Sequence, residues 1–284
     1  MVDSSSVDSR PRGNRVANKI AIVTGGGAGI GRTTAKLLAR EGATVVVADR
    51  NTGNGEETVR QILAADGRAR FIPTDVSVEA DCVRLVEETV AAYERVDVLA
   101  NIAGIYPRSS LAETTIEFWR HVFATNLEGP FVLCREVVPH MVRNGGGSII
   151  NMGSGNGLAG GANLVAYSAA KGGLLTLTRN IAAAYSRDGV RVNYLIPGWV
   201  LTDNERVTQN AEGHDEAWLA ALAPNLQGGR FSTPEDAALA ILYLASDESA
   251  FVNGTILNTD GGSSMLPSGL WNVTARGTAK REAT

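Results

Sequence analysis

Short runs of β-branched and other apolar residues alternate with segments of helical periodicity along most of the chain. The apolar runs lie at residues 20–24, 43–49, 69–75, 96–104, 147–153, 189–197 and 254–262. Continuous apolar strands separated by helices are typical of a parallel sheet that is covered on both faces. We therefore predict an α/β fold with a doubly wound parallel sheet of about seven strands and helices on both faces. Its ligand crevice should lie at the carboxyl ends of the strands.

The length and the two ends of the chain indicate one domain. The sequence has 284 residues, and α/β folds of roughly 250 residues routinely form a single domain. Residues 1–18 and 263–284 are polar and carry no periodic pattern. We expect a single domain over residues 19–262 with flexible tails on either side.

Composition excludes several classes of function. The net charge is −4 and the charges are scattered, so no basic stripe is present to bind nucleic acid. Cys82 and Cys134 form no metal-ligand or disulfide pattern, and no metal is expected. The longest uncharged run, residues 144–170, contains eight glycines and four asparagines, which make it too polar for a membrane span. The N-terminus lacks the apolar core of a secretory signal. We expect a cytoplasmic protein that binds neither nucleic acid nor membrane.

A glycine-rich turn joins the first strand to the first helix. It reads Thr24-Gly25-Gly26-Gly27-Ala28-Gly29-Ile30-Gly31. Glycines at this position allow a tight turn and a close backbone approach to a pyrophosphate, which the N–H groups and dipole of the helix then bind. The motif alone is weak, but its place in the first unit of the sheet favours a dinucleotide-binding site.

Asp49 ends the second strand, 18 residues after Gly31. This spacing is close to that of the acid which binds an adenosine ribose. A carboxylate there accepts hydrogen bonds from the 2′-hydroxyl and repels a 2′-phosphate, by about 4 kcal/mol at about 4 Å and an effective dielectric near 20. We therefore predict NAD as the cofactor, with Arg50 as the one residue that softens the preference. Asp75, after the third strand, is a candidate for the adenine amino group and equally for a helix cap.

Tyr167 and Lys171 stand at i and i+4 in Tyr-Ser-Ala-Ala-Lys. On a helix the two side chains share one face, and an ammonium beside a phenol favours the phenolate and lowers its pKa. The pair can therefore serve as an acid/base couple. A buried tyrosine beside a snorkelling lysine is the structural alternative. Ser154, 13 residues before Tyr167 at the end of the fifth strand, can bind a substrate oxygen or be an ordinary turn serine.

Further motifs follow in a fixed order. They are Asp75-Val76, Asn101-Ile102-Ala103-Gly104, Asn126 in Thr-Asn-Leu-Glu-Gly, Ser154, Tyr167 with Lys171, Pro197-Gly198 with Thr202, and Asp260-Gly261-Gly262. Together with the glycine-rich turn, they make the chain resemble the short-chain dehydrogenase/reductase family from about Lys19 to Gly262. The sheet implied is of the Rossmann type, and the resemblance implies that residues 203–230 are the helical insertion that covers the active site in this family. Two residues depart from the usual pattern: Ile102 replaces an asparagine and Gly153 replaces a serine.

The resemblance implies a role for each motif residue. Tyr167 would be the catalytic acid/base, and Ser154 would orient the substrate oxygen. Lys171 would hold the nicotinamide ribose and lower the tyrosine pKa, and Asn126 would support a proton-relay water. The implied cofactor-binding residues are Gly25, Gly27, Ala28, Gly29, Ile30, Gly31, Asp49, Arg50, Asp75, Val76, Asn101, Ala103, Gly104, Tyr167, Lys171, Pro197, Gly198, Val200 and Thr202.

Other functions share part of this pattern. A methyltransferase that uses S-adenosylmethionine would explain the glycine-rich turn and Asp49, but it would not explain Ser154, Tyr167 and Lys171 together. An NAD-sensing protein without activity would not need the tyrosine and lysine pair. Within the family, a 3-oxoacyl-[acyl-carrier-protein] reductase usually prefers NADPH and has basic residues where Ala28 and Asp49 stand here.

The substrate is the least constrained feature. The amide groups of Asn156, Asn163 and Asn204 favour a secondary alcohol of the polyol or sugar type, whereas apolar side chains suit a steroid or aryl alcohol. These apolar side chains are Leu158, Trp199 and Trp218. The expected NAD preference implies oxidation in the cell. The predicted pocket residues are Gly155, Asn156, Trp199 and Asn204, with Asn163 as a further amide. The helix at residues 164–186 carries only Lys171 and Arg179 as charges, which predicts a homo-oligomer, most simply a homotetramer.

Overall fold

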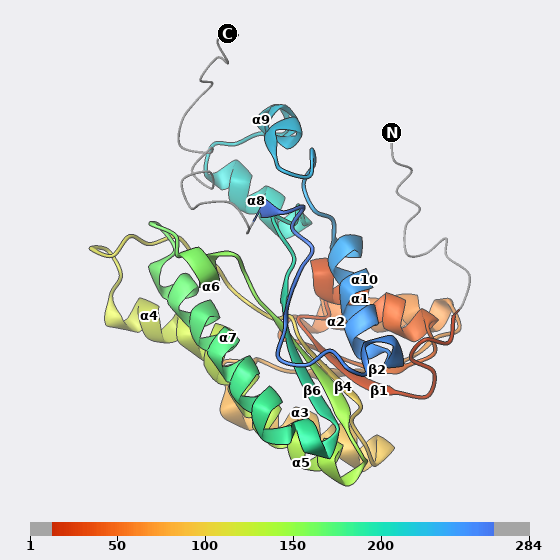
Figure 1. Ribbon diagram of the computed structural model, residues 1–284. Coiled ribbons are helices and arrows are strands. Elements are labelled where there is room, and N and C mark those ends of the chain that lie inside the picture. The colour runs from red at the N-terminus through yellow and green to blue at the C-terminus, as the bar shows by residue number, and fades with distance from the viewer. Residues whose placement is uncertain (1–12, 264–284) are drawn as a thin grey trace.

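The computed structural model describes residues 13–263 and contains a single seven-stranded sheet (Figure 1). In spatial order the strands are β3 (Arg68–Pro73), β2 (Thr44–Asp49), β1 (Ile20–Thr24), β4 (Val98–Asn101), β5 (Gly147–Met152), β6 (Val190–Ile196) and β7 (Ile256–Asn258). Every pairing between neighbouring strands is parallel. The predicted α/β fold is therefore confirmed.

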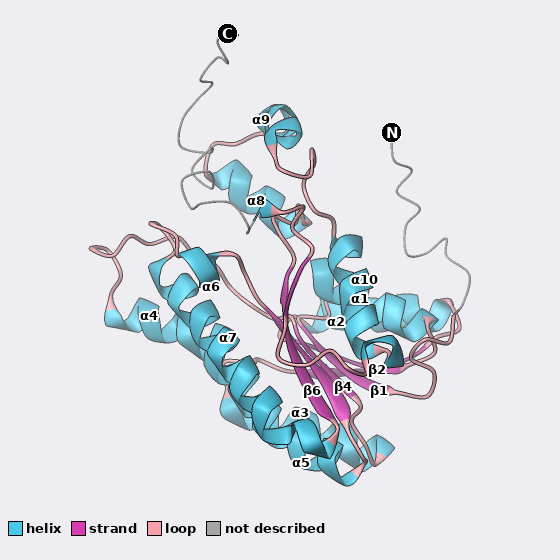
Figure 2. Cartoon of the chain, in the orientation of Figure 1, coloured by secondary structure: helices cyan, strands magenta, loops and turns pink. Residues whose placement is uncertain are grey.

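Helices pack on both faces of the sheet, as Figure 2 shows. One face carries α1 (Gly29–Arg40), α2 (Thr52–Ala64) and α10 (Pro234–Ala245), and the other carries α3 (Glu79–Tyr93), α5 (Gly129–Arg143) and α7 (Val165–Tyr185). Successive side chains of a strand point to opposite faces. In β1, Ala21 and Val23 pack in the cluster that includes α1, and Ile22 packs in the opposite cluster. This double burial explains why the strands are apolar throughout.

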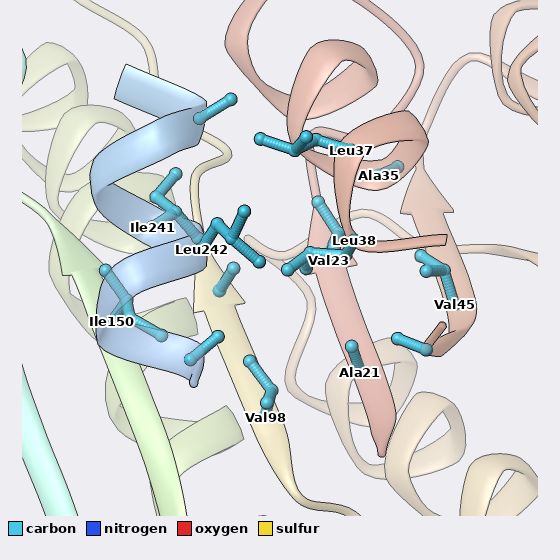
Figure 3. Packing of buried hydrophobic residues seen from close by; sticks show 14 of the residues in the cluster. Ala21, Val23, Ala35, Leu37, Leu38, Val45, Val98, Ile150, Ile241 and Leu242 are labelled. Atoms are coloured by element: carbon cyan, nitrogen blue, oxygen red, sulfur yellow. The ribbon is translucent and has the colours of Figure 1, made fainter. Parts of the chain in front are cut away.

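The core beneath α1 and α10 fixes the end of β1. Leu38 of α1 and Leu242 of α10 meet above Val23, and all three side chains are fully buried or nearly so (Figure 3). Burial of one such side chain contributes about 1.5–3 kcal/mol. The strand and the helix that flank the glycine-rich turn are therefore held rigidly, and the turn between them has little freedom.

The order of the strands creates the predicted crevice. From β1 the chain adds β2 and β3 on one side of the sheet, and then β4 to β7 on the other. The loops that leave β1 and β4 therefore diverge to opposite faces, and ligands of open α/β sheets bind in the gap that this leaves.

The helical segment between β4 and β5 is divided into three parts. They are α4 (Ile116–Phe123), a π-helical segment (Ala124–Glu128) and α5. A π-helical turn inserts extra residues into a helix and often occurs at functional sites. Here it contains the predicted site residue Asn126. The sequence retains its helical character through this segment, so periodicity alone does not reveal the interruption.

The segment over the crevice is helical, as expected for residues 203–230. It contains α8 (Asp203–Ala211) and α9 (Glu216–Leu222), and the short helix α6 (Asn156–Ala159) lies after β5. Leu219, Leu222 and Phe231 form a small apolar cluster of their own with Trp199 and neighbouring residues. This cluster supports residues 203–230, here called the lid, independently of the two main cores.

The domain begins earlier than the polar composition of residues 1–18 suggested. Val16 is buried in the core cluster of α1, and Arg15 forms a 2.7 Å ion pair with Glu248. Most of both predicted tails, residues 1–12 and 264–284, lies outside the described residues. Within residues 13–263, no helix has the length and hydropathy needed to cross a membrane.

Candidate active site

A cavity of about 1280 Å³ lies at the carboxyl edge of the sheet. With two exceptions, Gly27 and Asn101, every residue predicted for the catalytic, cofactor and substrate sites lines it. The wall also includes residues that the sequence did not single out, among them Tyr106, Arg108, Glu205 and Gln209. Residues from opposite ends of the chain therefore meet in one cavity, as the doubly wound topology requires.

The glycine-rich turn is compact enough to admit only glycine at two of its positions. Gly25 has φ +64°, a left-handed conformation that side chains disfavour. A Cβ on Gly31 would lie 2.0 Å from the carbonyl oxygen of Gly25. Ala28 is the N-cap of α1 and provides no side-chain cap, so the first N–H groups of the helix are available to an anion. The turn therefore fits a pyrophosphate.

Asp49 lies at the cavity wall beside this turn. Its Oδ2 accepts a hydrogen bond from Gly27 N at 2.9 Å, and its Oδ1 accepts one from Asn51 N at 2.8 Å. Gly27 thus takes part by holding Asp49, although it does not line the cavity itself. A carboxylate can accept about four hydrogen bonds, so both oxygens retain capacity for a ribose hydroxyl.

Asp75 and Asn101 are fixed by local contacts. Asp75 Oδ1 accepts hydrogen bonds from the Ser77 hydroxyl at 2.6 Å and from Ser77 N at 2.9 Å, and the hydroxyl contact is the main reason that the pKa of Asp75 is lowered. Asn101 is buried beneath the cavity, where its Nδ2 donates to Asn151 Oδ1 at 2.9 Å. Its side chain therefore supports the end of the sheet, and the cavity wall is formed by the residues that follow it.

The loop after β4 is held by Thr24. The threonine Oγ1 accepts hydrogen bonds from Ile102 N at 3.0 Å and Ala103 N at 3.1 Å. Ile102, Ala103 and Gly104 then line the cavity. The isoleucine in place of the family's asparagine leaves this backbone arrangement intact, because the contacts use only main-chain N–H groups.

Tyr167 and Lys171 share one face of α7, as the spacing predicts. The Lys171 ammonium lies 5.7 Å from the centroid of the Tyr167 ring and donates a 2.8 Å hydrogen bond to the carbonyl of Met152. Lys171 is only 3% exposed, and burial lowers its pKa to about 8. The amine thus lies between the tyrosine and the end of β5.

The pKa of Tyr167 is raised, with burial as the largest cause. A hydrogen bond to the side chain of Ser154 and the charge of Arg108 act in the opposite direction, and the charge of Glu205 adds to the rise. The sequence-based argument expected Lys171 to lower this pKa. Burial outweighs the favourable contacts in the structure, and the ammonium is directed to the Met152 carbonyl.

Ser154 is positioned by a residue that sequence reasoning missed. Tyr194 of β6 is fully buried; its hydroxyl accepts a hydrogen bond from Ser154 N at 3.0 Å and donates one to Lys171 O at 3.1 Å. The Ser154 Oγ accepts a hydrogen bond from Asn156 N at 3.2 Å. A Cβ on Gly153 would lie 2.0 Å from the Tyr194 ring. The glycine that replaces the family's serine therefore makes room for this tyrosine.

Asn126 joins the π-helical segment to the loop that follows Gly104. Its Nδ2 donates to Ile105 O at 2.8 Å and to Val122 O at 3.0 Å, and its Oδ1 accepts from Ile105 N at 3.3 Å. The side chain therefore orders the segment that carries Tyr106, whose ring centroid lies 6.3 Å from that of Tyr167.

The loop after β6 completes the cavity. Pro197, Gly198, Trp199 and Val200 line it, and Gly198 adopts φ +79°. Thr202 is the N-cap of α8 and accepts a hydrogen bond from Glu205 N at 3.1 Å. Asn204 lines the cavity but is largely exposed to solvent. The inward-facing polar residues of the lid are instead Glu205 and Gln209, both of which are buried.

Known proteins are similar to this chain over most of its length. A family model described as enoyl-(acyl carrier protein) reductase matches residues 25–264. A cis-4-hydroxycyclohexanecarboxylate dehydrogenase from Sinomonas cyclohexanicum is 38% identical over 251 residues, which cover 88% of this chain and 98% of that protein.

Two solved structures are similar throughout. One, described as a short-chain dehydrogenase/reductase from Burkholderia xenovorans, has a TM-score of 0.85 and 34% identity and covers 90% of this chain and 100% of the other. Another, described as an NAD(P)-dependent gluconate 5-dehydrogenase from Beutenbergia cavernae with NADP bound at low occupancy, has a TM-score of 0.82 and 36% identity. It covers 89% of this chain and 100% of the other.

Proposed function

Because the chain belongs to the short-chain dehydrogenase/reductase family, we propose that it is an NAD-dependent oxidoreductase which interconverts a secondary alcohol and its ketone. The observation that carries the proposal is the convergence of Ser154, Tyr167 and Lys171 in the cavity that also contains the glycine-rich turn. A dinucleotide bound along that turn would extend toward the three side chains. Bound NAD supplies the acceptor for the hydride that leaves the carbinol carbon.

The roles of the side chains follow from their chemistry. In the oxidative direction Tyr167, as phenolate, removes the proton from the substrate hydroxyl, and in reduction its hydroxyl returns a proton to the ketone oxygen. Ser154 donates a hydrogen bond to the same oxygen and holds it near the tyrosine. Lys171 holds the nicotinamide ribose and, while it is protonated, opposes the effect of burial on the Tyr167 pKa. Asn126 keeps the adjoining loop in place and supports proton exchange with solvent.

Loss of the tyrosine hydroxyl tests this mechanism. We expect Tyr167→Phe to bind NAD with unchanged affinity and to lose at least roughly 100-fold in kcat, the low end of general acid/base contributions. Tyr185→Phe is the matched control, because Tyr185 is an exposed tyrosine at the end of the same helix. Turnover of the Tyr167 variant near that of the unaltered chain would remove the residue from the mechanism.

The preference for NAD rests on Asp49. Its carboxylate is fixed by two backbone N–H groups at the place where an adenosine ribose would lie, and it would repel a 2′-phosphate. Arg50 lines the same part of the cavity and softens the preference. Catalytic efficiency with each cofactor is the test. An efficiency with NADP equal to or above that with NAD would contradict the assignment.

The substrate proposed is a secondary hydroxyl of a polyol, sugar or related small alcohol, oxidised in the cell. Asn156 and the lid residues Glu205 and Gln209 give the cavity polar groups, and a purely apolar ligand would leave their remaining hydrogen-bonding capacity unused. The test compares kcat/KM for polyols and sugars with that for cyclic or aryl alcohols. A more than tenfold advantage for the apolar alcohols would overturn the polar-pocket proposal.

A reductase of carrier-bound 3-oxoacyl groups is the second candidate. The description of the matching family model names an enoyl group on an acyl carrier protein, which favours a carrier-bound substrate but not the 3-oxoacyl group itself. Against it stand Ala28 and Asp49 at positions where a phosphate-binding cofactor site would use basic residues. Reduction of a 3-oxoacyl thioester with NADPH, at an efficiency above that of every alcohol tested, would select this candidate.

A further inference from the structure

The lid carries a buried carboxylate that the proposed mechanism does not use. Glu205 lies in the first turn of α8, lines the cavity and is only 6% exposed. Its Oε1 accepts hydrogen bonds from Trp199 Nε1 at 2.8 Å and from Gln209 Nε2 at 2.9 Å. Trp199, in the loop before the lid, and Gln209 thus hold one negative charge at the wall of the cavity.

Cations close to Glu205 are paired elsewhere. Arg108 forms a 2.9 Å ion pair with Glu212, and Arg206 pairs with Glu216. Across residues 13–263 no ion pair involves Glu205. An unpaired buried charge is costly unless hydrogen-bond donors surround it. The carboxylate has capacity for about four hydrogen bonds. Trp199 and Gln209 supply two, and the Tyr106 hydroxyl is a third partner.

Glu205 is also close to the reacting group. Tyr106 packs edge-on against Tyr167, with ring centroids 6.3 Å apart. Burial raises the pKa of both tyrosines, and the charge of Glu205 adds to the rise; for Tyr106 a hydrogen bond to Glu205 adds as well. The carboxylate and the reactive hydroxyl therefore line the same cavity, and Tyr106 contacts the residues that carry both.

We propose that Glu205 is a specificity-determining residue that accepts a hydrogen bond from a second hydroxyl or an ammonium group of the substrate and disfavours substrates with a carboxylate in that place. The preferred substrate class is therefore a neutral diol or an amino alcohol. This inference rests on the proposed function, because it assumes that the reactive hydroxyl binds at Tyr167. It deepens that function by naming the second point of recognition.

A ring series with one change at a time tests the inference. The substrates are cyclohexanol, cyclohexane-1,2-diol and 2-hydroxycyclohexanecarboxylate, which carry a hydrogen, a hydroxyl or a carboxylate on the same ring carbon, each with NAD. We expect the unaltered chain to prefer the diol over cyclohexanol by at least about tenfold in kcat/KM, equivalent to about 1.4 kcal/mol. In Glu205→Gln, this ratio should fall to within about threefold, and kcat/KM for the carboxylate should rise severalfold.

The ratio of kcat/KM for the diol to that for cyclohexanol distinguishes recognition of the substrate by Glu205 from a structural role of Glu205 in the lid. A purely structural role for Glu205 would reduce turnover of all three substrates equally, and the fraction of folded enzyme cancels when substrates are compared on one preparation. Asp203→Asn is the matched control, because Asp203 is an exposed acid in the same turn of α8. We expect the diol preference of this control to match that of the unaltered chain.

Binding gives a second readout that does not depend on turnover. Calorimetric titration of cyclohexanol and the diol into the chain with NADH, a pair that cannot react, should give the same tenfold preference and the same loss in Glu205→Gln. If no alcohol is oxidised but this binding preference is observed, the proposed function fails and the recognition role stands. An unchanged ratio in Glu205→Gln, a preference for the carboxylate in the unaltered chain, or no binding of either ring would overturn the inference.

Discussion

The buried amine of Lys171 makes a prediction about stability that can be worked from the structure. Its pKa is lowered from 10.5 to about 8 by burial. A difference of this size between the folded and the unfolded chain corresponds to about 3 kcal/mol, at 1.36 kcal/mol per pKa unit. Below pH 8 the amine is charged in both states, and the folded state bears the full cost. Between pH 8 and pH 10.5 the folded chain releases its proton first, so this contribution to stability rises with pH.

Lys171→Met isolates that cost, because methionine keeps much of the aliphatic stem and carries no charge. The variant also loses the 2.8 Å hydrogen bond to the Met152 carbonyl, which contributes about 1 kcal/mol. At pH 7 we expect the variant to be more stable than the unaltered chain by about 2 kcal/mol. Near pH 10.5, where the desolvation cost is absent, we expect it to be less stable by about 1 kcal/mol.

Urea unfolding of both proteins at pH 7, 8.5 and 10 measures the difference. Other titrating groups are common to the two chains and cancel when the free energies of unfolding are subtracted. The stability advantage of Lys171→Met should shrink steadily as the pH rises and should reverse near pH 10.5. A difference that stays constant over this range would show that the Lys171 amine is well solvated or otherwise compensated, and would refute the reasoning. The activity of the variant should be largely lost at every pH.

Three other predictions follow from the site and the surface. Gly31→Ala should weaken NAD binding at least tenfold in a fluorescence titration, since the new Cβ would lie 2.0 Å from Gly25 O; unchanged affinity would contradict the close packing of the turn. Asp49→Asn should raise kcat/KM with NADP at least tenfold, because about 4 kcal/mol of repulsion is removed at about 4 Å; no change would exclude Asp49 from cofactor selection. Light scattering should give a homo-oligomeric mass, because α7 exposes few charges and Phe131 on α5 is exposed; a monomer mass at all concentrations would refute this.

The strands could be predicted because both of their faces are buried. Runs such as residues 44–48 have no polar alternation, and a buried parallel strand is the structure in which such a run is most stable. The predicted ends of the strands were less accurate. Residues 102–104 continue the apolar run of β4, yet pairing with β5 ends at Asn101. The chain leaves the sheet there because Thr24 captures the next two N–H groups, a contact between residues far apart in sequence.

The candidate site was predictable where chemistry is encoded at short range. The glycine-rich turn, Asp49 and the Tyr167 and Lys171 pair each have a spacing with a physical meaning. Tyr194 and Glu205 have none. In the sequence, Tyr194 is one of several large residues in a buried strand. Glu205 is one acid in a polar helix, where the neighbouring Asn204 was the predicted pocket residue. Their roles depend on which side of β6 and α8 faces the cavity, and only tertiary packing decides that.

The buried polar groups of the site lower the stability of the fold, and the apolar sheet beneath them offsets this loss. Lys171 and Glu205 are buried ionisable groups, and Asn101 Oδ1 is buried without a hydrogen-bond partner in the described part of the chain. The buried Lys171 amine and the unpartnered Asn101 oxygen each lower stability by an amount on the order of a few kcal/mol, which is a large share of the 5 to 15 kcal/mol by which a folded domain is stable. All three lie at the carboxyl edge, whereas the strand interiors are apolar on both faces. Substitutions that remove buried side-chain volume from the core around β1 or β4 should therefore impair activity through unfolding before they alter the geometry of the site.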